Sequence, residues 1–135
     1  MEQNDKNLLI KDLCGRLPYG VVVHFEGWNP EKLTQIDLRE LVFNDMGGIP
    51  KPYLRPLSSM TEEERDELKR IFNCDYVEFD CLDFTVGGSV DYDTFCMYYE
   101  HCAELIDWLN ENHFDYRGLI PKGLALEAKE GMYKN

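Results

Sequence analysis

Four carboxylates recur at helical spacing inside a stretch that we predict to be a helix over residues 93–112. They are separated by four, three and four residues, so in a helix they share one face. The four residues are Glu100, Glu104, Asp107 and Glu111. Such a row is typical of a solvated helix face, and it also suits a docking surface for a protein with a basic surface.

The same stretch carries an apolar face made of Phe95, Tyr98, Cys102, Leu105, Ile106 and Leu109. Trp108 flanks the acidic row, where an exposed indole would be a candidate anchor for a partner. If the tail or the sheet covers it, the indole belongs to the core, and the sequence favours that alternative. The candidate partner-binding residues are therefore Glu100, Glu104, Asp107, Trp108 and Glu111.

Three arginines occur next to tyrosines in segments bounded by glycine or proline. Because a guanidinium offers two parallel donors and stacks on rings, convergence of these side chains would form a pocket for an anion or small ligand. Such a pocket could also belong to an enzyme. The alternative is that the arginines pair with carboxylates such as Asp12 or Asp115. The candidate ligand-binding residues are Arg16, Tyr19, Tyr53, Arg55, Tyr116 and Arg117.

Recognisable catalytic and metal-binding motifs are absent from the sequence. There is no Gly-x-Ser-x-Gly elbow, no phosphate-binding glycine loop and no His-Glu-x-x-His. The five cysteines lack the short paired spacing of a zinc site. We therefore predict no catalytic residues, no metal and no cofactor, and the sequence favours a non-catalytic protein while leaving an enzyme as the alternative.

The net charge of −12 is concentrated in the middle of the chain. Residues 61–113 hold fifteen acidic and three basic residues, whereas residues 1–60 hold eight and seven. A surface of this kind repels nucleic acid and anionic membranes and favours basic protein partners. A ladder of carboxylates also resembles a phosphate backbone, so nucleic-acid mimicry is a third hypothesis.

Length and composition predict one domain spanning residues 1–135. The hydrophobic fraction of 44% is ordinary for a folded protein. No apolar run reaches the roughly 18 residues of a membrane span, and the first residues are polar. An odd number of cysteines, five, indicates free thiols in a reducing cytoplasm. The sequence does not indicate an oligomeric state.

Periodicity predicts the elements of the first half of the chain. We expect a helix over 4–17 with Asn4 as its cap and an apolar stripe facing inward. Alternation predicts strands at 19–26 and 33–41, joined as a hairpin. Two glycines and three prolines favour a loop or an edge strand over 44–58.

The second half begins with a capping box formed by Thr61 and Glu64. It predicts a helix over 62–72 that turns Leu68, Ile71 and Phe72 inward. The following elements are a strand at 76–84, a turn at Gly87 and Gly88, a helix over 93–112 capped by Asp91 or Asp93, and a last strand at 124–126.

This mixture of elements predicts an α+β fold: a small antiparallel or mixed sheet with two to three helices packed on one face.

Three stretches together resemble a family of small uncharacterised proteins encoded by phages and mobile elements of gut Bacteroidales. They are 11–21, 52–64 and a third stretch formed by 107–110, 113–120 and 122–125. All three arginine–tyrosine segments lie within them, whereas most of the acidic row lies at or outside their edge. The resemblance implies a bacterial cytoplasm and a phage-type gene context, and it implies no activity. We therefore predict a small acidic accessory protein that binds another protein without catalysis.

Overall fold

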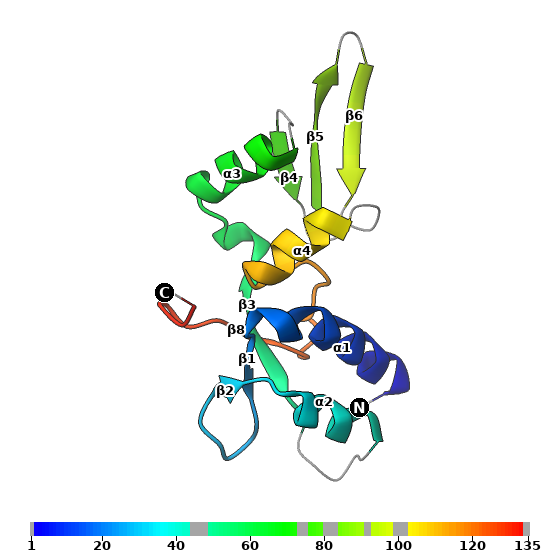
Figure 1. Ribbon diagram of the computed structural model, residues 1–135, viewed down its shortest axis with the longest axis vertical. Helices are drawn as coiled ribbons and strands as arrows, with labels where there is room; N and C mark the ends of the chain where they lie inside the picture. The colour runs from blue at the N-terminus through cyan, green and yellow to red at the C-terminus, as the bar shows by residue number, and fades with distance from the viewer. Residues whose placement is uncertain are drawn as a thin grey trace.

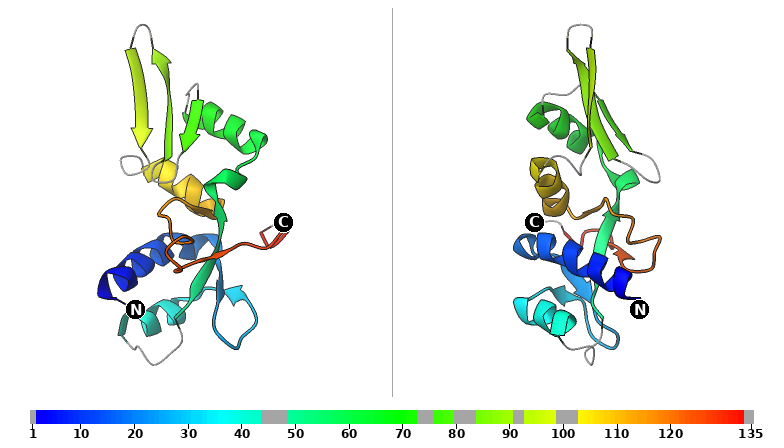
Figure 2. Two further views of the ribbon diagram at one scale, coloured as in Figure 1. Left: turned by 180° about the vertical axis from the view of Figure 1, so that it is seen from behind. Right: turned by 90° about the vertical axis from the view of Figure 1, so that its right-hand side faces the viewer.

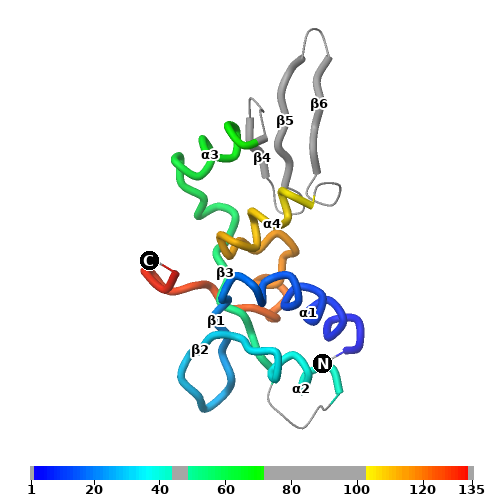
Figure 3. Tube along the Cα trace, viewed as in Figure 1, coloured from blue at the N-terminus to red at the C-terminus, as the bar shows by residue number. Residues whose placement is uncertain are grey.

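The computed structural model describes residues 2–43, 49–72, 76–79, 84–90, 93–98 and 103–133. For residue 72 and the three strands that follow it, the description covers the backbone alone. Figure 1 shows the arrangement of the elements, and Figure 3 traces the chain from the N-terminus, where α2 lies beside α1.

Within the described residues the chain forms helices and a mixed sheet, which confirms the predicted α+β class. The α-helices are α1 (Gln3–Arg16), α2 (Gln35–Phe43), α3 (Glu62–Phe72) and α4 (Ala103–Glu111). Two short 3₁₀ turns, η1 (Leu17–Tyr19) and η2 (Leu57–Ser59), follow α1 and β3.

The larger sheet joins strands from both halves of the chain. Its described strands are β1 (Val22–His24), β2 (Glu31–Lys32), β3 (Lys51–Pro56), β7 (Phe114–Asp115) and β8 (Leu126–Glu127). The order is β2-β1-β3-β7, and β8 also pairs with β3. The strands β2 and β3 are antiparallel to β1, whereas β7 and β8 run parallel to β3.

Strand β3 corrects the prediction that 44–58 is loop or edge structure. It is the strand with the most partners, because β1, β7 and β8 all pair with it. Its prolines stand at 52 and 56, so the residues between them keep their amide hydrogens. The amide of Arg55 donates to the carbonyl oxygen of His113 at 2.7 Å, and the carbonyl of Leu54 accepts from Ala128 at 2.7 Å. Residues 44–48 lie outside the described residues.

Helix α2 replaces the strand predicted at 33–41, which was wrong. Thr34 and Asp37 form a reciprocal capping pair: the Thr34 amide donates to the Asp37 carboxylate at 2.9 Å, and the Asp37 amide donates to the Thr34 hydroxyl oxygen at 3.2 Å. This pair satisfies amide hydrogens that a helix N-terminus leaves free. The true hairpin partner of β1 is the short β2, with Val23 opposite Glu31.

Helix α1 matches the prediction for 4–17 closely, but its cap does not. The N-cap residue is Glu2, with no side-chain cap bond, so Asn4 lies inside the first turn. The strand predicted at 19–26 is shorter than expected. Pro18 at the start of η1 and Gly20 at φ 70° hold the chain in a tight turn before the strand begins at Val22.

Helix α3 confirms the predicted capping box. The Thr61 amide donates to Glu64 Oε1 at 3.0 Å, and the Glu64 amide donates to Thr61 Oγ1 at 3.2 Å. Leu68 is fully buried as predicted, whereas Ile71 is 50% exposed, so that expectation was wrong. The side chain of Phe72 lies outside the described residues.

A second, antiparallel sheet contains β4 (Tyr76–Phe79), β5 (Phe84–Val90) and β6 (Asp93–Tyr98). It corrects two predictions. Gly87 and Gly88 do not turn the chain but lie within β5, opposite Cys96 and Phe95. In place of the predicted helix over 93–112, residues 93–98 pair with β5 as a strand rich in aromatic residues and threonine, and helix α4 spans Ala103–Glu111. Residues 99–102 lie outside the described residues. Residues 80–83 lie outside the described residues, and the last strand is at 126–127 rather than 124–126.

The described core lies between the larger sheet and the helices. In the left-hand view of Figure 2, α1, α2 and α4 lie on one side of β1 and β3, which agrees with the predicted packing on one face. Buried apolar residues from α1, β1, α2, β3 and the tail form one cluster: Leu9, Leu13, Val21, Val23, Leu33, Leu41, Leu54, Leu119, Leu124 and Ala125. This packing fixes which face of each helix remains outside.

Candidate functional site

The outward face of α4 carries three of the four predicted carboxylates. Glu104, Asp107 and Glu111 are all exposed, at spacings of three and four. Within the described part of the chain, none of the three makes an ion pair. We name these three residues the α4 acidic face. Glu100, the fourth member of the predicted row, lies outside the described residues.

The α4 acidic face borders η1, the turn that ends α1. Partial burial raises the pKa of the Tyr19 phenol, and the negative charges of Asp107 and Glu111 raise it further. These effects require the two carboxylates to lie near the phenol. Tyr19, predicted as part of an anion pocket, therefore lies in a negative electrostatic environment that disfavours an anion.

Trp108 belongs to the interior, which is the alternative that the sequence favoured. Its side chain is 6% exposed and stacks on Phe114, with ring centroids 5.8 Å apart and planes 15° apart. Its Nε1–H donates to a carboxylate oxygen of Glu67 on α3 at 3.4 Å. The indole therefore joins α3 to α4 and offers little surface to a partner.

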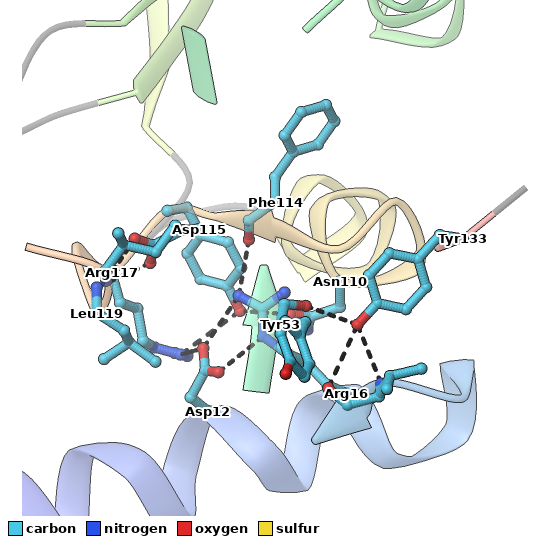
Figure 4. A network of polar contacts seen from close by, with 12 residues as sticks. Asp12, Arg16, Tyr53, Asn110, Phe114, Asp115, Arg117, Leu119 and Tyr133 are labelled. Atoms are coloured by element: carbon cyan, nitrogen blue, oxygen red, sulfur yellow. Dashed lines mark hydrogen bonds and ion pairs between the residues drawn. The ribbon is translucent and has the colours of Figure 1, made fainter. Parts of the chain in front are cut away.

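Arg16 is the centre of a buried polar cluster, shown in Figure 4. It is fully buried, and its Nε and Nη2 donate to the Asp12 carboxylate at 2.7 and 3.1 Å. Nη2 also donates to the carbonyl oxygen of Phe114 at 2.7 Å. Nη1 is buried and has no acceptor among the described residues. The i, i+4 spacing of Asp12 and Arg16 on α1 places the two groups on one side of the helix.

Arg117 shares the same carboxylate. Its Nη1 lies 3.5 Å from Asp12 Oδ1. The guanidinium groups of Arg16 and Arg117 lie 5.1 and 4.8 Å from the ring centroid of Tyr116, so both make cation–π contacts with it. Two cations thus converge on one carboxylate and one ring. Asp115, the other predicted partner, instead accepts the amide hydrogens of Leu119 and Ile120 at 2.8 and 2.9 Å.

Arg55 is engaged with a different carboxylate. Its Nη1 and Nη2 donate to the two oxygens of Glu64 at 2.8 and 2.6 Å, and its guanidinium lies 4.2 Å from the Phe114 ring centroid. Burial raises the pKa of Glu64, but hydrogen bonds from Arg55 and from the Thr61 amide outweigh burial and leave that pKa lowered. Arg55 therefore ties β3 to the start of α3.

The structure brings together only part of the predicted ligand-binding set. Arg16, Tyr116 and Arg117 form one cluster. Tyr53 does not join them; its hydroxyl lies 3.5 Å from His24 Nδ1, and Lys129 Nζ lies 5.8 Å from its ring centroid. Each of the three guanidinium groups already holds a carboxylate of this chain, so the predicted pairing with carboxylates such as Asp12 is the arrangement observed.

Asn110 is a cluster member that sequence reasoning missed. Its Oδ1 accepts a hydrogen bond from the Tyr116 hydroxyl at 2.8 Å. A Cβ added to Gly15 would lie 2.9 Å from Asn110 Nδ2, so a glycine permits this close approach of α1 and α4. The only local signal was a single glycine within a helical pattern, which often marks a close contact.

His113 and Tyr133 form a second missed feature. Their rings stack with centroids 3.6 Å apart, and the Tyr133 hydroxyl donates to the Tyr53 carbonyl at 2.6 Å and accepts from the Val22 amide at 3.0 Å. Burial lowers the pKa of His113 to about 4, and the positive charges of Arg16 and Arg55 add to that shift. Burial raises the pKa of Tyr133 to about 12. No signal near Tyr133 in the sequence indicates partners this distant.

Among the described residues, no group of three or more histidine, cysteine, aspartate or glutamate side chains gathers as a metal site would require. None of the described helices is long and apolar enough to cross a membrane.

Comparison with known proteins adds no relative: no family model matches the chain, and no curated protein or solved structure is similar to it.

Proposed function

We propose that this protein is a non-catalytic accessory module that binds a protein with a basic surface through the α4 acidic face. The observation that carries the proposal is the contrast between the two sides of α4. Leu105, Trp108 and Leu109 anchor the helix in the interior, while its three outer carboxylates stay exposed without a cation from the described residues. Carboxylates held on a rigid helix are pre-organised for basic side chains.

The anion-pocket alternative has weaker support. Arg16, Arg55 and Arg117 already hold carboxylates, and Arg16 is fully buried. Nucleic-acid mimicry needs the carboxylates of α4 to continue in space with those of 62–67 or 75–83. Of these, Glu67 contacts α4 through Trp108, and the side chains of 75–83 lie outside the described residues. Mimicry therefore stays a prediction.

An affinity pull-down from a bacterial lysate tests the proposal with two variants of equal charge change. The first neutralises the α4 acidic face with Glu104→Gln, Asp107→Asn and Glu111→Gln. The matched control neutralises three exposed carboxylates of α3 with Glu62→Gln, Glu63→Gln and Asp66→Asn. We expect the wild type and the control to retain the same protein and the α4 variant to lose it.

Binding through exposed carboxylates should also weaken as salt rises, because the Debye length falls from about 10 Å at 0.1 M to about 3 Å at 1 M. If both variants retain the same protein, the interface lies on a surface other than the α4 acidic face. Equal losses in both would indicate attraction by net charge without a defined surface. If even the wild type retains no protein, the proposal loses its basis.

A further inference from the structure

The segment 128–133, which follows β8, crosses strand β3 and is held at its two ends. At one end, the Ala128 amide donates to the Leu54 carbonyl oxygen at 2.7 Å. At the other end, the Tyr133 hydroxyl donates to the carbonyl oxygen of Tyr53 at 2.6 Å. Carbonyl groups of consecutive strand residues point to opposite edges, so the two ends lie at opposite edges of β3. The first three residues after Ala128 are exposed. We name this segment the strap.

The backbone groups of Val22 point from β1 towards β3. At the other edge of β1, the Leu33 amide donates to the Val21 carbonyl oxygen at 2.9 Å, and neighbouring residues of a strand bond to opposite sides. The register between β1 and β3 places Val22 opposite Tyr53. In an uninterrupted antiparallel ladder, the Val22 amide would therefore donate directly to the Tyr53 carbonyl oxygen.

The Tyr133 hydroxyl stands between these two groups instead. It accepts a hydrogen bond from the Val22 amide at 3.0 Å and donates one to the Tyr53 carbonyl oxygen at 2.6 Å. A phenol can do both because it carries one donor and an acceptor oxygen. Its ring stacks on His113, with centroids 3.6 Å apart and planes 12° apart. One side chain of the strap thus replaces a direct hydrogen bond of the sheet by two bonds of its own.

We propose that the strap is a conformational device with two states. In the closed state, Tyr133 bridges Val22 and Tyr53. In the released state, the strap leaves the sheet, and Val22 and Tyr53 bond directly to each other. Both states satisfy the same two backbone groups, so release leaves neither of them buried and unpaired. Exchange between the two states therefore needs only local opening of the strap.

Release uncovers two aromatic side chains that the strap covers in the closed state. Tyr53 is 5% exposed, and Lys129 Nζ of the strap lies 5.8 Å from its ring centroid. His113 is 8% exposed and lies under the Tyr133 ring. The device thus controls access to an aromatic surface beside the larger sheet. Neither Tyr53 nor His113 belongs to the α4 acidic face, so the strap acts whether or not a partner binds there.

Trypsin cleavage of the native protein after Lys129 measures release. A protease needs an extended segment, so the cleavage rate follows the released population when opening and closing are fast. Tyr133→Phe keeps the ring and removes the hydroxyl. We expect this cleavage to become about tenfold faster, because the closed state loses two hydrogen bonds and the released state loses none. The matched control, Tyr19→Phe, removes the same group from another half-buried ring and should leave the rate unchanged.

Amide hydrogen exchange in Tyr133→Phe distinguishes a removable insert from a fixed part of the sheet. The Val22 amide should keep its protection within about threefold, because the Tyr53 carbonyl oxygen becomes its direct acceptor. Equal cleavage rates in the wild type and Tyr133→Phe would overturn the proposal. Loss of Val22 protection in Tyr133→Phe would also overturn it, since the ladder then does not close without the hydroxyl. The same acceleration in Tyr19→Phe would show general destabilisation and would count against the device equally.

Discussion

Helices α2 and α4 have nine residues each and lie on the same side of the larger sheet, yet their outward faces differ in kind. The face of α4 presents like charges, and the face of α2 presents apolar side chains around a pair of opposite charges. Like charges on a helix attract a basic surface, whereas exposed apolar side chains are stabilised by contact with another apolar surface. Two helices with the same role in the core are therefore suited to different partners.

The largest expected effect on stability comes from the buried polar cluster around Arg16, which packs beside α4 and not beside the outward face of α2. Asp12→Ala would leave Arg16 buried without its carboxylate and should lower the free energy of unfolding by roughly 3–5 kcal/mol. Phe43→Ser on the outward face of α2 should change it by no more than about 0.5 kcal/mol. Urea denaturation measures both. Equal effects of the two variants would contradict this difference between the helices.

As pH falls, we expect the region around α4 to lose stability before the region around α2. The pKa of His113, just after α4, is about 4 in the folded chain and 6.5 in a free side chain. As pH falls, the unfolded chain therefore binds the proton first. The stability that this histidine contributes is complete above pH 6.5 and is lost as pH falls from 6.5 towards 4, with a total of about 3 kcal/mol.

Amide hydrogen exchange at pH 7 and pH 5 measures this loss of stability in each helix separately. Between these pH values, the amides of α4 should lose more protection than the amides of α2. His113 has φ 62°, which asparagine tolerates, so His113→Asn removes the titration without straining the backbone. The variant should show the same protection of α4 at both pH values. A wild type whose two helices lose protection together would show that His113 does not act locally.

The smallest effect tests the acidic face itself. Glu111 lies in the last turn of α4, four residues after Asp107, so the helix dipole and a like charge both oppose it. Glu111→Gln should raise the free energy of unfolding by about 0.5 kcal/mol at low salt. It should also lower the pKa of Tyr19, because Glu111 is one of the charges that raise it. Spectroscopic titration of the phenol checks the second effect, and an unchanged pKa would place Glu111 away from η1.

Sequence reasoning succeeded where the cause of an element is local. The capping box at Thr61 and Glu64 and the pair formed by Asp12 and Arg16 both depend on residues three or four apart. It failed at α2 because Thr34, Ile36, Leu38 and Glu40 alternate as in a strand. The capping pair of Thr34 and Asp37, which the structure shows, outweighed that alternation.

The remaining errors have distant causes. Strand β3 pairs with residues about 30 positions before it and about 60 to 70 positions after it. The local sequence, with its two glycines and three prolines, therefore suggested a loop or an edge strand. The cluster around Arg16 depends on the carbonyl of Phe114, 98 residues away, and the Tyr133 hydroxyl reaches Val22 across 111 residues. No local pattern contains such pairings.

The position of β3 between early and late strands has a consequence for synthesis on the ribosome. When β3 has emerged, β1 is already available, but β7 and β8 are not, because they come from residues 114–127. A nascent chain at that stage carries a half-paired strand with hydrogen-bonding groups open to other chains. Completion of the larger sheet must therefore wait for residues 114–127, and a stalled chain that ends before them should be the species most dependent on chaperones.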